Sequence, residues 1–387
     1  MTNELAVFRR VDFDSVRRLK EVWLDDPESD VKMHTHVLTR FEDSLDYLCS
    51  SGKKLGLVVT GGAGIGKTHL IGRVRRAAMA RGAFFILIDC TDILHFWPTL
   101  ALQYLQNLQQ EYIDQRGIKS TQIEGLLANL IHRTSSRYPA DLLREMSGMK
   151  RDNLIQLAND VVVRLKRSFP SRMLRHGTVR ALFYLYSGEQ SLTDLAYAYL
   201  QGQTLESIPE VSAVYLGGTN SPKEVVSDLA WLMSLKAPTV LAFDQMDPIV
   251  TQHRLLAADE NHESQAIIQG VVNGLMSLID TLQETLPFVA LLEITFQTLL
   301  KWGLHSAIDR LQLPPIPLDP PRGPETYEQM VRERLESGYR LGGFTPSYST
   351  WPFRPSFFGT LSGRTHREVL KRCEQHRLAC LMAKQDL

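Results

Sequence analysis

Short hydrophobic runs, separated by longer stretches of helical periodicity, dominate the pattern of this chain. Four of the runs are rich in β-branched and aromatic residues, which predicts strands that are buried on both faces. These runs are Leu55–Thr60, Ala83–Cys90, Pro238–Asp244 and Phe288–Thr295. A helix is predicted between the first two runs, from Lys67 to Arg81. Strand, helix and strand in this order form a βαβ unit, so the chain is predicted to fold around a parallel sheet.

The rest of the pattern is helical. An amphipathic helix is predicted at His36–Leu48, and apolar residues recur at helical spacing through most of Thr91–Ala237, without an internal repeat. A long helix is predicted at Ser264–Thr285. The Pro-rich stretch "LPPIPLDPPRGP" marks a boundary, and further helices are predicted beyond it at Glu325–Leu335 and Thr365–Met382.

These elements divide the chain into four predicted parts. An N-terminal helical segment covers residues 1–50, and an α/β core is made of 51–92 and 238–313. A large all-helical insertion covers 93–237, and a small helical C-terminal domain covers 314–387. The predicted fold class is therefore α/β, a parallel-sheet core with a large all-helical insertion and a small helical C-terminal domain.

Composition narrows the class of protein. The 387 residues include 43 basic (Lys and Arg) and 43 acidic (Asp and Glu) side chains, which argues against a protein that coats nucleic acid by charge alone. A local basic patch is compatible with this balance. The cysteines form no CxxC pair, which argues against zinc and suits buried thiols in a reducing compartment. Because no apolar run has the length of a signal-peptide core or a membrane span, we expect a cytoplasmic protein without a membrane partner.

The stretch "GGAGIGKT", Gly61–Thr68, matches the G-x-x-x-x-G-K-[ST] pattern of a phosphate-binding loop. Glycines let successive backbone N–H groups point at phosphate oxygens, and Lys67 would neutralise the β- and γ-phosphates. The alternative is a glycine turn without function, but a strand before the loop and a helix after it provide the context that the motif requires. We therefore predict ATP as the cofactor. The predicted cofactor-binding residues are Gly61, Gly62, Ala63, Gly64, Ile65, Gly66, Lys67, Thr68 and His69.

An acid at the end of a second buried strand completes such a site. Asp244 ends the run "TVLAFD", and together with the Thr68 hydroxyl it is predicted to hold Mg²⁺. Gln245 follows Asp244, where many phosphate-loop hydrolases have a glutamate, and an amide can orient water but cannot accept its proton. Two other acids are candidates for accepting that proton. They are Asp247 in the same loop and Glu293, which we predict to lie inside a buried strand. A structural ion pair is the alternative for Glu293.

With these motifs in this order, the chain resembles the AAA+ ATPases from about residue 50 to residue 382, most of the insertion excepted. Within that group it looks most like the initiator-loader, transposition-regulator and STAND-like branches and the ATPases of bacterial phage-defence loci. The stretches "LKEVWLDDPESDVKMHTHVL" and "YLQGQTLE" carry the phage-defence part of the resemblance. The resemblance implies a phosphate-loop core with a C-terminal helical lid.

The resemblance also implies roles for three further positions. Thr295 stands where the family has the polar sensor-1 residue near the γ-phosphate. "HSAIDRLQLPPIPLDPP" looks like the arginine-finger region, in which Arg310 would reach a neighbouring subunit's site. "LSGRTHREVLKRC" looks like the lid helix with sensor 2, in which Arg367 has the matching place and Arg364 is the alternate. An arginine near the γ-phosphate would stabilise the transition state and report whether the nucleotide is intact.

One segment of the insertion is strongly basic. Between Val161 and Gly188 there is no acid, although a solvated helix normally mixes both signs of charge. The segment could contact a DNA or RNA backbone or an acidic protein surface. The alternative is a basic face that pairs with acids elsewhere in the chain. The basic residues are Arg164, Lys166, Arg167, Arg172, Arg175 and Arg180.

The favoured function is an ATP-binding and ATP-hydrolysing homo-oligomer that acts as a switch or remodeller on nucleic acid or a partner protein, in phage defence or a mobile element. The first alternative is a slow or non-hydrolysing scaffold that gates an effector protein, and Gln245 favours it. The second is a small-molecule kinase, which needs neither a lid helix of this kind nor so long an insertion.

Overall fold

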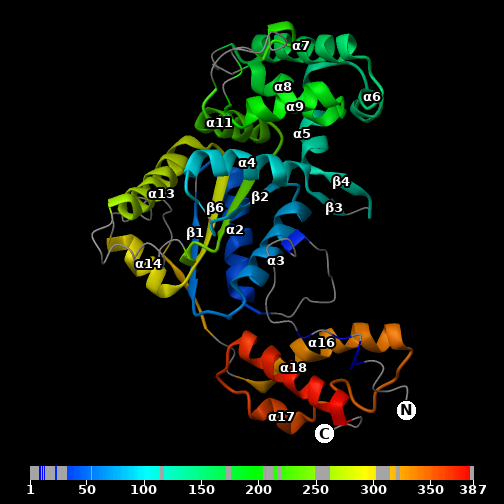
Figure 1. Cartoon of the computed structure of the whole chain (residues 1–387), viewed down its shortest axis with the longest axis vertical. Helices are drawn as coiled ribbons and strands as arrows, with labels where there is room; N and C mark the ends of the chain where they lie inside the picture. Colours follow the sequence, from blue (N-terminus) through cyan, green and yellow to red (C-terminus); the bar gives the residue numbers. More distant parts are fainter. Residues whose placement is uncertain are drawn as a thin grey trace.

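Five parallel strands form the central sheet of the structure, a computed structural model (Figure 1). It describes, and all that follows concerns, residues 8–9, 11, 13, 22–23, 33–53, 55–91, 93–113, 117–170, 176–203, 205, 212–216, 220–248, 262–301, 314–319 and 323–383. The strand order is β2-β5-β6-β1-β7. The strands are β1 Leu57–Gly61, β2 Phe84–Asp89, β5 Thr239–Asp244, β6 Thr285–Leu291 and β7 Ile316–Leu318. The predicted α/β class with a parallel sheet is confirmed.

Strand β6 ends earlier than predicted. It stops at Leu291, and helix α14, Glu293–Leu299, begins almost directly after it. The prediction that Glu293 and Thr295 belong to a buried strand is therefore wrong. The reason lies in the neighbouring strand, because β1 pairs Thr60 with Leu291 and then turns into the glycine-rich loop. Residues beyond Leu291 have no strand left beside them on that side.

Strand β7 lies inside the Pro-rich stretch, where no strand was predicted. It pairs with β1 in parallel, with Thr60 opposite Pro317. Because β7 is an edge strand, Pro317 can occupy it without removing a hydrogen bond from the interior of the sheet.

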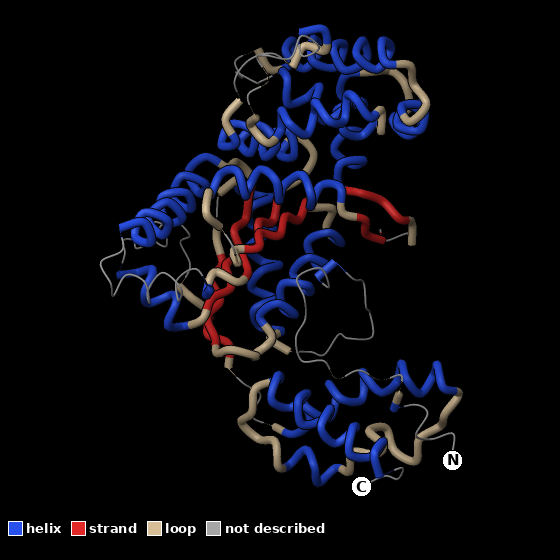
Figure 2. The backbone as a smooth tube through the Cα atoms, viewed as in Figure 1, coloured by secondary structure: helices blue, strands red, loops and turns tan. Residues whose placement is uncertain are grey.

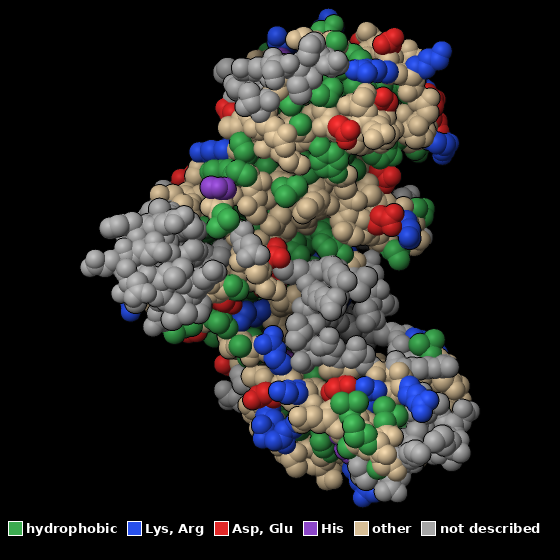
Figure 3. All heavy atoms as spheres, viewed as in Figure 1, with side chains coloured by type: hydrophobic (Ala, Val, Ile, Leu, Met, Phe, Trp, Pro, Cys, Tyr) green, Lys and Arg blue, Asp and Glu red, His purple; other side chains and the backbone are tan. Residues whose placement is uncertain are grey.

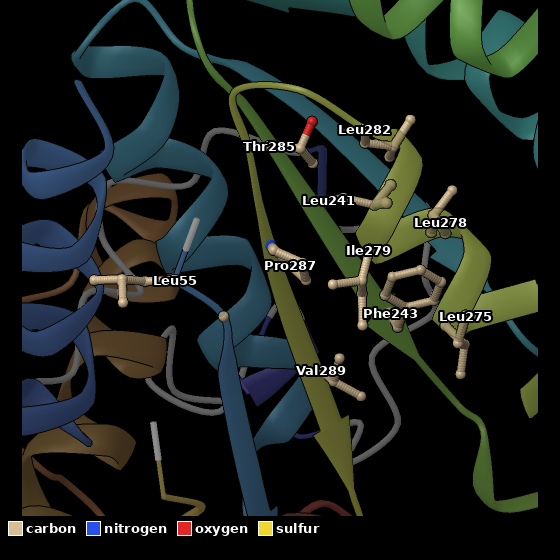
Figure 4. Close-up of a pocket in the computed structure, with 11 residues that line it drawn as sticks. Leu55, Leu241, Phe243, Leu275, Leu278, Ile279, Leu282, Thr285, Pro287 and Val289 are labelled. Carbon is tan, nitrogen blue, oxygen red and sulfur yellow. The ribbon is translucent and has the colours of Figure 1, made fainter. Parts of the chain in front are cut away.

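Helices cover both faces of the sheet (Figures 1 and 2). The alternating side chains of β1 are buried on opposite sides, because Leu57 and Val59 belong to one apolar core and Val58 to the other. The helices on the first side are α2 Thr35–Ser51 and α3 Lys67–Ala80, and those on the second are α4 Phe96–Gln109 and α13 His262–Thr281. Side chains of α13 and the sheet leave an apolar pocket between them, lined by Leu241, Phe243, Leu278 and others (Figure 4). The pocket lacks the convergent polar groups that a nucleotide requires.

The insertion lies beyond α4, on the side of the sheet away from the C-terminal helices (Figure 1). It is helical apart from one two-stranded hairpin, β3 with β4, which was not predicted from the sequence. Its apolar core continues the core of the sheet, since Ile86 of β2 belongs to the same buried cluster as Leu130 and Leu182 of the insertion. The elements are β3 Glu111–Ile113, β4 Lys119–Thr121, α5 Gln122–Thr134, α6 Pro139–Met146, α7 Arg151–Ser168, α8 His176–Ser187, α9 Gln190–Leu200 and α11 Pro222–Ser234.

The free edge of β2 is covered by three side-chain amides, which we call the amide ladder. Each amide donates to a backbone carbonyl of β2 and accepts from the N–H of the same residue, as a neighbouring strand would. The donor and acceptor distances lie between 2.7 and 3.0 Å. The pairs are Gln122 with Phe85, Asn107 with Leu87, and Gln103 with Asp89. The ladder therefore satisfies the edge strand and attaches α4 and α5 to it.

Three C-terminal helices form a bundle below the sheet in Figure 1. Residues Phe8 and Phe13 of the N-terminal segment pack into its core beside Phe353. The bundle therefore joins both ends of the chain. Its helices are α16 Pro324–Gly342, α17 Pro355–Gly359 and α18 His366–Ala383.

Candidate nucleotide-binding site

The glycine-rich loop leaves β1 at Gly61 and enters α3 at Lys67. A Cβ atom at Gly61 would lie 2.9 Å from the Cβ of Leu318 in β7, so a larger residue does not fit there. Gly64 and Gly66 have φ angles of 76° and 97°, in the left-handed region. Gly66 caps α3, and no side chain that the structure describes accepts a cap hydrogen bond there. The first N–H groups of α3 can therefore bind an anion.

The Lys67 ammonium donates to the carbonyl oxygens of Gly61 and Gly62, at 3.1 and 3.2 Å. Burial lowers its pKa, whereas the carboxylates of Asp247 and Asp244 act in the opposite direction. The side chain thus lies against the loop, beside two acids. Of the other predicted cofactor residues, Gly62 and Ala63 are exposed, Ile65 is buried and His69 is half-buried.

The hydroxyl of Thr68 donates to Asp244 Oδ2 at 2.7 Å and joins the loop to the end of β5. The Asp244 side chain is only 2% exposed. Burial raises its pKa, and hydrogen bonds from Thr68 and from the Gln245 N–H counteract that effect. A hydroxyl and a carboxylate are oxygen ligands of the kind that Mg²⁺ binds, so the pair fits the predicted metal site.

Gln245 has a φ of 58°, which turns its backbone away from the strand direction. Its side-chain amide lies 3.2 Å from the Thr91 hydroxyl. Asp247 accepts a hydrogen bond from the backbone N–H of Leu292 at 2.9 Å and so holds the segment that follows β6. Both residues thus lie next to Asp244, as the sequence predicted, and each has a structural partner.

Glu293 is the first residue of α14, and it is exposed. It is therefore not the costly buried carboxylate that was predicted. Hydrogen bonds from Gln297 and Thr60 lower its pKa, and Thr60 belongs to the end of β1, directly before the loop. Thr295 is 1% exposed inside α14 and does not end a strand.

Helix α18 approaches the loop with its first turn. The backbone N–H of Arg367 donates to Gly64 O at 3.1 Å, and a Cβ atom at Gly64 would lie 2.6 Å from the Cβ of Arg367. The Arg367 guanidinium is close enough to lower the pKa of Lys67. Arg364 instead accepts the Tyr327 hydroxyl at its carbonyl. Arg310 lies outside the described residues.

Two histidines that were not predicted as site residues hold the loop from two sides. His366 Nδ1 lies 2.8 Å and His34 Nε2 lies 3.1 Å from the carbonyl oxygen of Ile65, and we call this arrangement the histidine clasp. Burial lowers the pKa of His366 to about 4 and also lowers the pKa of His34. Both rings are therefore neutral near pH 7 and donate N–H groups to one acceptor. No sequence motif indicates such a contact between residues 301 positions apart.

Asp89 is another residue near the site that was not predicted from the sequence. It ends β2 and is directly paired with Asp244 in the register of the sheet. The sequence does indicate an acid at this edge of the sheet, because the predicted strand "AFFILID" ends in an aspartate just as "TVLAFD" does. Its carboxylate accepts hydrogen bonds from the backbone N–H and the hydroxyl of Thr91, at 2.9 and 2.6 Å.

The described residues of the basic segment differ in their contacts. Arg164 donates to the carbonyl of Thr134 at the end of α5, and Arg180 donates to Asn159 and stacks on Tyr215. Lys166 and Arg167 are exposed at the end of α7. On the face drawn in Figure 3, basic side chains of the insertion are scattered among acidic ones. Arg172 and Arg175 lie outside the described residues.

A parallel sheet, a glycine-rich loop between β1 and α3, and an acid from β5 bonded to the loop threonine define a nucleotide-binding domain of the P-loop class. The family model of the AAA ATPase domain matches residues 35–269, more than half of the chain. The chain belongs to this family of nucleotide-binding ATPases. Comparisons with curated proteins and with solved structures found no match. Of the helices that the structure describes, none combines the length and apolar character of a membrane span.

Proposed function

We propose that this ATPase binds ATP with Mg²⁺, hydrolyses it, and works as an oligomeric switch or remodeller on nucleic acid or a partner protein. The observation that carries the proposal is the 2.7 Å hydrogen bond between Thr68 and Asp244. It supports the proposal because a hydroxyl and a carboxylate, oxygen ligands of the kind that Mg²⁺ binds, meet beside the glycine-rich loop. The Asp244 carboxylate also acts on the pKa of the Lys67 ammonium.

In this site Mg²⁺ neutralises phosphate charge when ATP is bound. Thr68 and Asp244 would hold the ion. Lys67 would exchange its bonds to the loop carbonyls for bonds to phosphate oxygens, which accept hydrogen bonds more strongly. The N–H groups at the start of α3 would bind the same phosphates.

Glu293 is the proposed acceptor of the proton from the attacking water. Its pKa is lowered by hydrogen bonds, so the carboxylate is ionised at neutral pH, and it contacts Thr60 directly before the loop. Asp247 is the alternative, and its carboxylate likewise accepts a hydrogen bond, from the Leu292 N–H. The Gln245 amide would orient the water and not accept its proton.

The contacts between α18 and the loop support a role as a switch. Gly64 and Ile65 provide the carbonyls that bind Arg367 and the histidine clasp. A nucleotide that reshapes the loop would therefore act on the C-terminal bundle, which also packs Phe8 and Phe13. Arg367 would sense the γ-phosphate. Thr295, inside α14, would serve as the polar sensor-1 residue near the same phosphate.

Oligomerisation is proposed through Arg310, acting on the site of a neighbouring subunit. An Arg310→Ala variant should bind ATP but hydrolyse it poorly, and mixing it with Lys67→Ala subunits should restore part of the turnover. No recovery at any mixing ratio, with both variants assembling normally, would contradict the role in trans.

DNA and an effector protein are the proposed partners, in phage defence or a mobile element. Among the described residues of the basic segment, Lys166 and Arg167 are the ones that support DNA, because Arg164 and Arg180 have partners within the insertion. A slow or non-hydrolysing scaffold remains the second function, and Gln245 in place of an acid favours it. ATP turnover measured with and without DNA separates the two, and mass photometry with a slowly hydrolysed ATP analogue tests assembly. Turnover that stays at the level of Asp244→Asn in every condition would favour the scaffold.

A further inference from the structure

An exposed tyrosine of the insertion has a backbone conformation that tyrosine rarely adopts. Tyr215 has a φ of 58°, in the left-handed region, and it is 55% exposed. Its neighbours Val214 and Leu216 are fully buried, and the carbonyl oxygen of Val214 accepts the Tyr184 hydroxyl at 3.0 Å. The backbone is therefore held on both sides, while the ring of Tyr215 stays at the surface. Glycine or asparagine would suit this φ better, so the turn itself does not account for a tyrosine.

The guanidinium of Arg180 lies over the Tyr215 ring, 5.4 Å from its centre. Its Nε donates to Asn159 Oδ1 at 2.6 Å, and its Nη1 donates to the carbonyl oxygen of Tyr215 at 3.3 Å. These partners are neutral, and within the described part of the chain no carboxylate pairs with Arg180. The contacts therefore position the guanidinium without neutralising its charge. Its Nη2 group has no acceptor among the described residues and can donate to a ligand.

Two further basic side chains lie near Arg180. His176 precedes it by one turn on the same face of α8. Burial, and then the positive charges of Arg180 and Lys166, lower the pKa of His176. Lys166 follows Asn159 by two turns on one face of α7, and Val163, which is 47% exposed, lies between them on that face. The two helices thus present positive charge and apolar surface beside each other.

Positive side chains next to an exposed aromatic ring are suited to single-stranded nucleic acid, because any base can stack on the ring while phosphates contact the charges. Arg180 covers one face of the Tyr215 ring, and no described ring stacks on the other. We propose that Tyr215, Arg180 and Lys166 form a binding site for single-stranded nucleic acid, in which a base stacks on Tyr215 and the neighbouring phosphates bind Arg180 and Lys166. A duplex keeps its bases stacked on each other and offers none to the ring.

This inference rests on the proposed action on nucleic acid. It narrows that proposal from a salt-dependent contact with any DNA backbone to a site that prefers unpaired strands. The preference also separates the site from a basic surface that meets an acidic protein, because a run of carboxylates has no base to stack on Tyr215.

Fluorescence anisotropy of a labelled oligothymidylate of about 15 nucleotides, measured with the full chain at low salt, tests the site. Tyr215→Asn, which suits the positive φ, should weaken binding roughly tenfold or more, and Tyr215→Phe, which keeps a ring, should restore it. Tyr138→Asn is the matched control, because Tyr138 is an exposed tyrosine of the same insertion. Lys166→Ala should reduce the slope of log affinity against log salt by about 0.7. Equal affinity of Tyr215→Asn and the control would overturn the inference.

Other probes separate the alternatives. A duplex of the same length should bind more weakly and should not respond to Tyr215→Asn. An oligouridylate distinguishes RNA from DNA, and loss of binding in Tyr215→Asn with either strand supports the site. No binding of either strand by the wild type at low salt overturns it. Polyglutamate that binds the wild type as tightly as the single strand does would assign the surface to an acidic protein and also overturn it.

The same variants separate this inference from the proposed function. If single strands bind through Tyr215 but leave ATP turnover unchanged, the site stands and the proposed action of the ATPase on nucleic acid fails. If DNA stimulates turnover and Tyr215→Asn leaves both binding and stimulation unchanged, the proposed function stands and this site fails.

Discussion

At the scale of single residues, the phosphate site depends on side chains that have several partners each. Lys67 contacts two carbonyls of its own loop and lies near two acids, whereas Thr68 and Asp244 satisfy each other. These are the groups that a bound nucleotide and its metal ion would contact, so substitutions among them are expected to weaken ligand binding.

Lys67→Ala should weaken ATP binding by roughly 100-fold, because no other cation of the loop can replace its charge-assisted hydrogen bonds. Calorimetry of ATP binding measures the effect. Lys166→Ala, an exposed lysine of α7, is the matched control and should bind as the wild type does. Equal affinity of Lys67→Ala and the control would show that Lys67 does not contribute to ATP binding.

Glu293→Gln should reduce turnover by a factor on the order of 100 or more and trap bound ATP, because the variant keeps the size of the side chain but cannot accept a proton. Single-turnover assays with labelled ATP measure it. Asp247→Asn is the comparison, and Asp244→Asn should lose turnover through the metal. Normal turnover in Glu293→Gln together with loss in Asp247→Asn would transfer the role to Asp247.

Much of this site was predictable from sequence, since the loop and Asp244 are local motifs at the ends of recognisable strands. Glu293 was misplaced because the end of β6 is set by where β1 stops, and that is a property of the sheet and not of the run "FVALLEIT". The histidine clasp was beyond sequence reasoning, because it depends on how α2 and α18 meet the loop.

At the scale of elements, the amide ladder takes the place of a neighbouring strand along the free edge of β2. Asn107 lies on α4 with a buried side chain and satisfies both backbone groups of Leu87. Helical periodicity predicted α4, but it could not indicate that polar residues on its buried face would act as an additional strand.

Asn107→Leu should lower the free energy of unfolding by roughly 1–3 kcal/mol for each of the two backbone groups that lose their partner. Chemical denaturation measures it. Gln106→Leu is the control, because Gln106 neighbours Asn107 on the same helix but is exposed. Equal stability of the two variants would mean that the ladder contributes nothing net.

At the scale of the whole molecule, the histidine clasp links the segment before α2, the glycine-rich loop and the C-terminal bundle. The groups that surround it are His36, Arg73 and Asp319, with Tyr327 against the ring of His366. Because burial holds the pKa of His366 near 4 and the unfolded value is 6.5, unfolding takes up a proton below pH 6.5. The contribution of the clasp is therefore complete above pH 6.5 and is lost as the pH falls toward 4.

His366→Asn should flatten the dependence of stability on pH between 6.5 and 5, because asparagine can donate to Ile65 O without titrating. The difference in slope should approach about 1.4 kcal/mol per pH unit, the value for one linked proton. Denaturation at several pH values measures it, with His132→Asn, an exposed histidine of α5, as the control. Parallel curves for wild type and His366→Asn would contradict the assignment.

The amide ladder also bears on how this protein can be dissected. Trimming the chain to a minimal ATPase by removing residues 93–237 would delete Asn107, Gln103 and Gln122 together and leave Phe85, Leu87 and Asp89 with bare donors and acceptors along one margin of the sheet. Such a margin recruits any extended chain that it meets, including a second copy of itself. The truncated core should therefore precipitate even with every nucleotide-binding residue intact, and a soluble minimal version needs α4 and the start of α5 as its protective border.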